Sequence, residues 1–522
     1  MKSKAKKKQE PAPVLQKQGP GWRDFVWFAL VAAAFVAFYW FVCEDSPLHD
    51  VFYSRDHIDR RDTPWYFTCG KAWMSGMTPY VDFADSKGPL LWLVYGLAYL
   101  ISPHDYLGVM LLNGIGYIAS LLCMFLTVRL FTKQSWSAAL VLLLTIPFLF
   151  IPDMHYETKS EDTSFIFMAL ALWQTCKILY SDDLTDRDWH RALFLWGLCF
   201  GGTLMIKYNS SVMLLVSLAF MLVKMYREKR AFWPEFWSGA TGGAVIVLPF
   251  VIYFLFKGCL WPFIDDYFIQ TPQTIANLQG QRSYFMQMLG RHDFVWILVM
   301  ILAGCGSSAL WLEKWKWFPL IVSAWFISLI MYFARGYYII ICGPLMVFIP
   351  LCFFFAFKKH KWPNILAAVL MLVIFGFVGW NLRKWYTKEY FGHTPMNDRR
   401  ERCHKMDGYM ASKMHKPRIL YYGCADKALG FSSEALPACR YWSLQGGYTK
   451  RMGEDQQQCV QERRADFVFI KTDADETRKN RLRDNGYVKV DLKDACKLLL
   501  YEKKELSDPP QVRHRKLQRK EK

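Results

Sequence analysis

The feature that most constrains this chain is a set of long apolar stretches that contain no charged side chain. Eight of them lie at residues 25–43, 135–151, 193–206, 236–256, 294–312, 317–334, 336–357 and 362–382. Three further apolar segments, at 106–130, 163–180 and 209–223, have basic residues at or near their ends. A helix needs about 20 mostly apolar residues to cross a bilayer, and a soluble protein would not bury so many such stretches. The sequence therefore predicts a mainly α fold over residues 23–383, a polytopic membrane bundle of about 11 transmembrane helices.

Basic residues are concentrated in the connections that would lie on one side of the membrane. They occur at 1–10, 133, 187–191, 224–230, 313–316 and 358–361, in alternate connections. Because Lys and Arg favour the cytoplasmic side, residues 1–22 are predicted to form a basic cytoplasmic N-terminus. The first apolar stretch is too long for a signal peptide, and no small-residue cleavage site follows it. The connections 44–105 and 153–163 are then the first and second outer loops.

Residues 384–506 have the composition of a soluble domain. Short β-like segments at 418–423, 465–472, 487–490 and 497–503 alternate with polar helical stretches, which is typical of a small α/β domain. An odd number of spans places this domain outside the cytoplasm, where we expect it to shape the acceptor side and to be dispensable for chemistry. Orientation in the membrane and a basic tail at 507–522 account for the net charge of +19. No nucleic-acid-binding fold accompanies this charge, so nucleic acid is not an expected partner.

Five cysteines fall in this soluble domain. They are Cys403, Cys424, Cys439, Cys459 and Cys496. An oxidising compartment permits one or two disulfides among them, and their spacing leaves the pairing open. The chain has no CxxC motif and no His pair at ligand spacing, which argues against a structural zinc site.

The first outer loop carries the most chemical information. Residues 61–96 read RDTPWYFTCGKAWMSGMTPYVDFADSKGPLLWLVYG, a segment rich in aromatic and turn residues. Asp62 stands near its start, and Lys87 directly precedes a Gly-Pro pair. A long loop with weak periodicity is more often functional than structural.

Several residues of this loop also have simple structural interpretations. Asp82 and Asp85 are predicted to cap turns, Gly88 and Pro89 to start a surface helix, and Trp65 and Tyr66 to anchor the loop at the membrane interface.

Ionisable residues gather at the outer ends of the predicted spans. They are Asp62 and Lys87 in the first outer loop, His155, Glu161 and Asp162 in the second, Arg282 after the seventh span, and Arg335 in a short turn. Ionisable groups beside apolar segments usually serve function. Anchoring to lipid headgroups explains a single arginine but not acids from two separate loops.

An acid can accept the proton of a hydroxyl that attacks a sugar carbon, and Lys or Arg can stabilise a departing phosphate. Arg282 and Arg335 are predicted phosphate ligands because of their charge and their depth at the headgroup level. The set is consistent with sugar transfer from a lipid-phosphate donor, and equally with other lipid-phosphate chemistry.

The first outer loop resembles that of bacterial GT-C superfamily membrane glycosyltransferases, in the branch of protein mannosyltransferases and lipid A aminoarabinose transferases. Members of this branch read roughly D-[ST]-x-x-[FY]-x-x-x-G-[KR]-x-[ML]-x-x-G-x-x-P-Y-x-D-x-x-D-x-K-G-P. The matching residues are Asp62, Gly70, Lys71, Gly76, Pro79, Tyr80, Asp82, Asp85, Lys87, Gly88 and Pro89. The segments KSEDTSFIFMALAL, FKGCLWPFIDDYFIQTP and ARGYYIIICGP are similar to later family segments. Many relatives have a His before the Tyr of the last segment, where this chain has Gly336 or Tyr337.

The resemblance implies roles for individual residues. Asp62 matches the catalytic acid, which acts as base toward the acceptor, and Lys87 matches a lysine associated with the donor phosphate. Glu161, with Asp162 beside it, matches a second acid that orients the acceptor or a divalent metal ion. Such an ion would have Asp62 and Glu161 as ligands. The candidate substrate contacts are His155, Tyr80 and Tyr337.

The function implied is transfer of a sugar, with inversion, from a polyprenyl-phosphate-linked donor to an envelope glycan, lipid or protein. The reaction would take place at the outer face of a bacterial inner membrane. Two alternatives stay open: an oligosaccharide ligase or polymerase of surface glycans, and a lipid-linked glycan transporter or flippase. A transporter usually shows internal repeats and polar residues at mid-membrane. This chain shows no obvious repeat, and its spans are nearly free of charge.

We expect the segments around Asp62 and Glu161, and the whole of residues 384–506, to lie on the outer side. Single engineered cysteines labelled with an impermeant maleimide in intact spheroplasts test this orientation. The positive-inside bias predicts labelling near Lys159 and none near Lys316. The reverse pattern would overturn the topology and the mechanism together.

Overall fold

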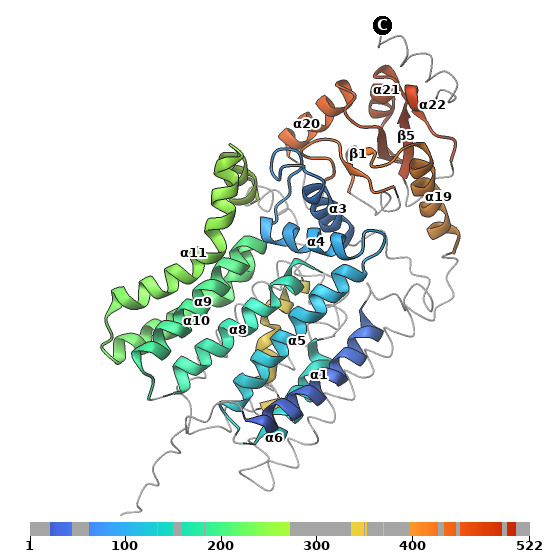
Figure 1. Cartoon of the computed structure of the whole chain (residues 1–522). Helices are drawn as coiled ribbons and strands as arrows, with labels where there is room; N and C mark the ends of the chain where they lie inside the picture. The colour runs from blue at the N-terminus through green and yellow to red at the C-terminus, as the bar shows by residue number, and fades with distance from the viewer. Residues whose placement is uncertain are drawn as a thin grey trace, which may run out of the picture.

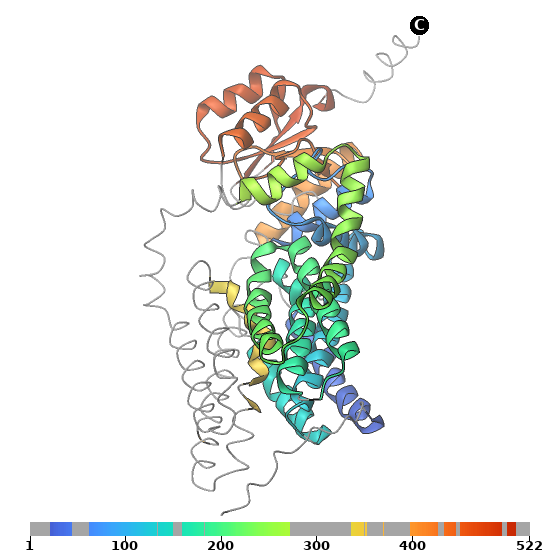
Figure 2. The same cartoon turned by 90° about the vertical axis from the view of Figure 1, so that its left-hand side faces the viewer.

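The computed structural model of the chain is mostly helical and carries a small β-sheet toward its C-terminal end (Figure 1). It describes residues 21–43, 62–132, 134–149, 159–181, 183–271, 336–348, 350–351, 369, 397–425, 433–444, 449–492 and 498–507. The long helices form a bundle, and the sheet with its own helices lies beyond one end of it (Figures 1 and 2).

Apolar helices cover the first seven predicted spans. They are α1 (Trp22–Val42), α5 (Leu107–Arg129), α6 (Ser135–Leu149), α8 (Ser160–Tyr180), α9 (Asp186–Ile206), α10 (Val212–Arg227) and α11 (Phe232–Phe256). In the described part of the chain, five helical segments are long and apolar enough to cross a membrane. The chain is therefore a multi-pass membrane protein. The last four predicted spans lie outside the described residues except for the 3-10 helix η6 (Gly336–Val347) and a few residues after it, so the count of about 11 stays a prediction.

Glycines let α9 and α11 approach each other closely. A Cβ added at Gly197 would lie 1.9 Å from the carbonyl oxygen of Gly239, and one added at Gly242 would lie 1.9 Å from that of Phe194. Small residues at such spacing allow two backbones to touch, which is a common mode of helix packing in membranes. This packing fixes the position of Ile206, the last residue of α9, beside the candidate site.

The segment 61–96 contains a helical hairpin where the sequence predicts an irregular loop. Its helices are α3 (Thr63–Met74) and α4 (Pro89–Ile101), and each has a proline in its first turn, where no backbone N–H is needed. A Cβ at Gly70 would lie 2.4 Å from the backbone nitrogen of Gly96, so the two helices also touch. Helix α4 starts at Pro89 as predicted, but much of it is buried rather than on the surface. Its 13 residues would extend about 20 Å, which is short of the bilayer core.

The C-terminal region folds around a five-stranded sheet with strand order β2-β1-β3-β5-β4. The strands are β1 (Arg418–Tyr421), β2 (Leu436–Pro437), β3 (Phe467–Lys471), β4 (Tyr487–Lys489) and β5 (Leu498–Lys503), and the helices are α19 (Asn397–Lys413), α20 (Lys450–Gln461), α21 (Glu476–Asp484) and α22 (Lys504–Ser507). Strands β2, β1 and β3 are parallel, and β5 runs antiparallel to β3 and β4. The four β-like segments of the sequence are all strands, whereas β2 is too short to give a pattern.

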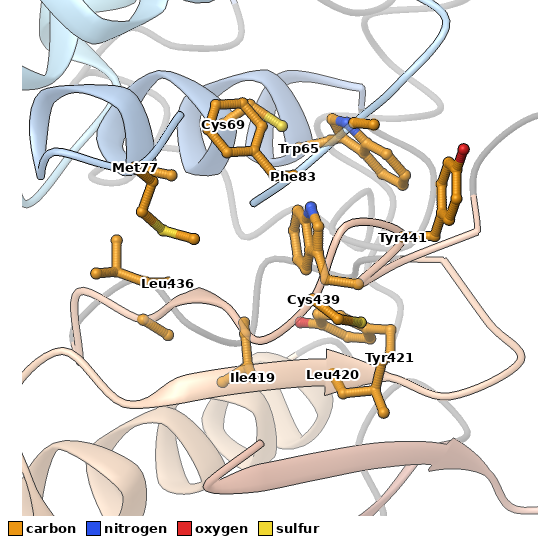
Figure 3. Close-up of a cluster of buried hydrophobic side chains, with 14 of the residues drawn as sticks. Trp65, Cys69, Met77, Phe83, Ile419, Leu420, Tyr421, Leu436, Cys439 and Tyr441 are labelled. Carbon is orange, nitrogen blue, oxygen red and sulfur yellow. The ribbon is translucent and has the colours of Figure 1, made fainter. Parts of the chain in front are cut away.

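This sheet region docks onto α3 and the turn that follows it. Figure 3 shows Trp65, Cys69, Met77 and Phe83 across an apolar layer from Ile419, Leu436 and Tyr441. The rings of Trp65 and Trp442 are 5.4 Å apart, and the backbone N–H of Ala84 donates to the carbonyl oxygen of Arg440 at 2.8 Å. The sequence predicts a domain that acts apart from the first outer loop, whereas the structure joins the two.

Substituting Gly242 with alanine is expected to lower the free energy of unfolding by about 1–3 kcal/mol, because the added methyl meets the backbone of α9. Gly116→Ala on α5 is the matched control, since nothing lies within 4 Å of its added Cβ. The control should leave stability unchanged or raise it by up to about 1 kcal/mol through helix propensity. Thermal unfolding of both variants in the same detergent measures this difference in stability. Equal melting temperatures would contradict the close packing.

Candidate active site

Tyr66 lies at the centre of the candidate site, on α3. Its side chain is fully buried, and its hydroxyl donates a hydrogen bond to Asp62 Oδ2 at 3.0 Å. The ammonium of Lys87 lies 5.6 Å from the centroid of the same ring, and Tyr95 packs edge-on against it at 5.4 Å. One tyrosine therefore joins the predicted base to the predicted phosphate ligand. The prediction that Trp65 and Tyr66 anchor the interface is wrong, because both are buried inside the protein.

Asp62 reaches Tyr66 because of its place on the helix. It occupies the N-cap position of α3, and its side chain makes no capping hydrogen bond. Residues four apart on a helix face the same side, which brings the carboxylate beside the Tyr66 hydroxyl.

Lys87 is held by the backbone on both sides. The Tyr80 hydroxyl donates to the Lys87 carbonyl oxygen at 2.8 Å, and the Gly88 N–H donates to the carbonyl oxygen of Ile206 at 2.8 Å. A Cβ at Gly88 would lie 2.0 Å from the carbonyl oxygen of Met205, so only glycine fits here. The Lys87 side chain is 14% exposed, and its ammonium lies 3.6 Å from Asp85 Oδ2.

The two acids of the second outer loop have different surroundings. Glu161 is 1% exposed, and its Oε1 accepts from Lys207 Nζ at 2.5 Å. Asp162 is the N3 residue of a capping box on α8: its Oδ2 accepts from the Lys159 N–H at 2.5 Å, and its Oδ1 accepts from the Tyr117 hydroxyl. Asp162 thus holds the start of α8, while Glu161 faces a cation.

The carboxylates of three acids act on the Tyr66 hydroxyl. Burial of the ring, followed by the negative charges of Asp62, Asp85 and Glu161, holds the pKa of Tyr66 well above its usual range. The hydroxyl therefore stays protonated and remains a donor to Asp62. Acids from the first outer loop and from α8 share one site, as the sequence predicts for groups at the same face.

The remaining polar residues of the first loop shape its turn. Asp82 Oδ2 accepts from the Thr78 N–H at 2.6 Å, which is the predicted turn cap. Asp85 caps with one oxygen only: its Oδ1 accepts from the Ser86 N–H at 2.6 Å. Tyr80 is fully buried at a φ of 65°, and its contacts are with protein groups, so its predicted substrate contact remains a prediction.

Some predicted site residues lie outside the described part of the chain. These residues are His155, Arg282 and Arg335. Tyr337 is described as part of η6. Their roles stay predictions. Within the described ranges, no group of three or more His, Cys, Asp or Glu side chains could hold a metal ion. The cation beside Glu161 in this structure is the ammonium of Lys207.

Sequence reasoning missed two residues of the site. The position of Tyr66, one helical turn after Asp62, could have predicted a contact between the two side chains. Lys207 is a lone lysine between two apolar stretches, directly after α9. Its partner Glu161 lies on another helix, and no local pattern links them.

Comparisons with known proteins found one matching family model and several similar solved structures. Residues 86–253 match the family model described as dolichyl-phosphate-mannose-protein mannosyltransferase. A solved structure of ArnT from Cupriavidus metallidurans bound to undecaprenyl phosphate is similar, with 12% identity and a TM-score of 0.58, over 93% of this chain and 99% of that one. The same enzyme in the apo state has 14% identity and a TM-score of 0.53 over the same shares. The Archaeoglobus fulgidus oligosaccharyltransferase AglB, in complex with an inhibitory peptide and a dolichol-phosphate, has 12% identity and a TM-score of 0.46, over 94% and 76% of the two chains. No curated protein sequence matches.

The fold is that of GT-C membrane enzymes. About a third of the chain is similar to the protein mannosyltransferase family model, and the fold of the chain is similar to that of ArnT. The matched residues include Lys87, Gly88 and Pro89 of the pattern in the first outer loop.

Removal of Lys207 tests whether the buried ion pair organises the site. Lys207→Met leaves Glu161 as an unpaired buried charge and is expected to lower the free energy of unfolding by about 3–5 kcal/mol. The double variant with Glu161→Gln should recover most of this loss. Lys450→Met, which removes half of an exposed ion pair with Glu454, should change stability by less than about 1 kcal/mol. Reversible unfolding in mixed micelles measures all three, and a Lys207 variant as stable as the Lys450 variant would refute the pairing.

Proposed function

We propose that this protein transfers a sugar from a polyprenyl-phosphate-linked donor to an envelope acceptor, with Asp62 as the base and Lys87 as a ligand of the donor phosphate. The observation that carries the proposal is the meeting of these two residues at Tyr66, one through a hydrogen bond and one over the ring. The family match to a dolichyl-phosphate-mannose-dependent transferase supports this class of donor. The likeness to ArnT bound to undecaprenyl phosphate also supports it.

Lys87 is suited to bind a phosphate. Its ammonium contacts Asp85 at 3.6 Å, which is longer than a hydrogen bond, so an incoming phosphate oxygen can compete for it. Charge-assisted contacts are strong where water is scarce, as around a side chain that is 14% exposed. Lys207 adds a second positive charge nearby, and Arg282 and Arg335 remain proposed further ligands.

The separate roles of Asp62 as base and Lys87 as phosphate ligand fit a single nucleophilic displacement at the anomeric carbon. The acceptor oxygen attacks the anomeric carbon, the bond from that carbon to the phosphate oxygen breaks, and the polyprenyl phosphate leaves with the bonding pair. Asp62 accepts the acceptor proton, while Lys87 stabilises the charge on the leaving phosphate. Attack from the side opposite to the departing phosphate inverts the configuration at the anomeric carbon.

The other residues support this centre without joining the reaction. Asp162 has both oxygens engaged in holding α8, and we assign it a structural role. Glu161 orients Lys207. Tyr80 positions Lys87 through its backbone.

We place the reaction at the outer face of a bacterial inner membrane, with the N-terminus in the cytoplasm. Helix α3, whose N-cap residue is Asp62, lies at the end of the bundle next to the sheet region (Figure 1). Arg129 and Lys224, in contrast, occupy the last turns of α5 and α10. This distribution supports the positive-inside orientation.

The variants Asp62→Asn and Lys87→Ala should separate base from phosphate ligand. General-base catalysis is worth about 10²- to 10⁴-fold, so Asp62→Asn should slow single-turnover transfer by that order while donor affinity changes little. Lys87→Ala should weaken donor binding and also slow the departure of the phosphate. Both are measured with the full-length protein in nanodiscs. Near-normal turnover in Asp62→Asn would remove the catalytic assignment.

A further inference from the structure

Helix α9 is interrupted beside the candidate site by a side chain from a distant segment. In an uninterrupted helix the N–H of Tyr208 would donate to the carbonyl oxygen of Leu204, four residues earlier. Instead, the Tyr208 N–H donates to the hydroxyl of Tyr267 at 3.0 Å, and this hydroxyl donates to the Leu204 carbonyl oxygen at 2.6 Å. A side chain inserted into the backbone hydrogen bonds of a helix breaks its axis. Here α9 ends at Ile206, and the 3-10 helix η2 (Tyr208–Ser211) begins directly after Lys207.

Lys207 is the residue at this break. Its backbone is extended, with φ of −161° and ψ of 107°, and its ammonium lies 2.5 Å from Glu161 Oε1. The carbonyl oxygen of the preceding residue, Ile206, accepts from the Gly88 N–H. Side-chain direction follows backbone conformation, so a helical Lys207 would point elsewhere. The extended backbone at this one position therefore directs the ammonium toward Glu161.

Tyr267 is fixed in place by its own packing. It belongs to the π-helical turn η3 (Asp265–Gln270), and its side chain is fully buried. Its ring meets that of Tyr208 edge-on at 5.7 Å and stacks on Phe263 at 5.9 Å. A phenol hydroxyl can donate and accept at once, which satisfies both backbone groups at the break. A phenylalanine ring would fill the same space but could not separate these two groups.

The residue before Tyr267 is held by the C-terminal region. Asp266 Oδ2 accepts from Arg440 Nε at 2.9 Å and from Arg440 Nη2 at 2.6 Å, and Asp266 Oδ1 accepts from the Tyr441 hydroxyl at 2.6 Å. A small pocket beside this contact is lined by residues that include Trp65, Asp85 and Ser443. The C-terminal region thus grips η3 at the position next to the inserted tyrosine.

We propose that Tyr267 is a positioning residue for Lys207: its hydroxyl holds the break in α9 that directs the ammonium toward Glu161, and the C-terminal region secures it through Asp266. The inference rests on the proposed function, in which Lys207 is a second positive charge near the donor phosphate. It gives the C-terminal region an influence on donor binding without contact with the donor. The sequence, in contrast, predicts a role on the acceptor side.

Tyr267→Phe keeps the ring and removes the hydroxyl. The Tyr208 N–H and the Leu204 carbonyl oxygen should then pair directly, and Lys207 should move away from Glu161. The coupling between Lys207→Met and Glu161→Gln, taken from a double-mutant cycle of reversible unfolding in mixed micelles, should fall to about half or less. A tyrosine that only supports the fold would lower stability and leave this coupling unchanged, which would overturn the inference.

Binding of bare undecaprenyl phosphate to the full-length protein in nanodiscs gives a second measurement. Tyr267→Phe should weaken this binding about 10-fold, the weight of one hydrogen bond to a charged group. In a protein that already carries Lys207→Met and Glu161→Gln, the same change should alter affinity by less than about 2-fold, because no ammonium is left to misplace. An equal loss of affinity in both proteins would contradict a role through Lys207.

Tyr253→Phe is the matched control for the lost hydroxyl, because the Tyr253 hydroxyl accepts from Trp73 Nε1 at 3.1 Å rather than bonding to α9. It should keep both the coupling and the affinity for undecaprenyl phosphate.

Two arginine variants test the link to the C-terminal region. Arg440→Gln should weaken the coupling in the same direction as Tyr267→Phe. Arg451→Gln should leave it unchanged, since Arg451 is 44% exposed and pairs with Asp265 on the same turn. Equal couplings in the two variants would overturn the part played by Asp266. Failure of the wild type to bind undecaprenyl phosphate would instead overturn the proposed function.

Discussion

The contact between the first loop and the end of α9 is the constraint on which the candidate site depends. Gly88 has no room for a side chain against Met205, and its N–H is bonded to Ile206. The next residue of α9's C-terminal turn, Lys207, then reaches Glu161 on α8. A single close approach of two backbones therefore brings the first loop, α8 and α9 together. A larger residue at position 88 would separate Lys87 from Lys207 and disperse the site.

A second feature of the architecture is that α3 packs between α4 and the sheet region. One side of this helix packs on α4, where Gly70 and Gly96 meet, and another side carries the sheet region through Trp65 and Trp442. Most of α3 is buried as a result, although it is neither long enough nor apolar enough to cross a membrane. Burial from both sides explains how an interfacial helix can hold Asp62 and Tyr66 in fixed positions.

The sequence predicts those features that depend on local pattern. Long apolar stretches locate α1, α5, α6 and α8 to α11, and short β-like segments locate four strands of the sheet. The common face of Asp62, Lys87 and Glu161 follows from the alternation of loops. Contacts between residues far apart in the sequence leave no local pattern. Nothing in the sequence near Lys207 indicates a contact with Glu161, and nothing near Trp65 indicates one with Trp442. Asp85 is an intermediate case, because the predicted turn cap accounts for its Oδ1, whereas its Oδ2 lies 3.6 Å from the Lys87 ammonium.

The pocket between Trp65, Asp85 and Ser443 has a consequence for how the protein is made. Its first wall is synthesised early and its last wall late, with most of the chain between them. Chains fold from the N-terminal end as they emerge from the ribosome, so the membrane helices are in place before the sheet exists. This pocket can close only when the C-terminal region has folded onto α3. An unfinished or truncated chain would then hold Asp62 and Lys87 without the sheet region that covers α3.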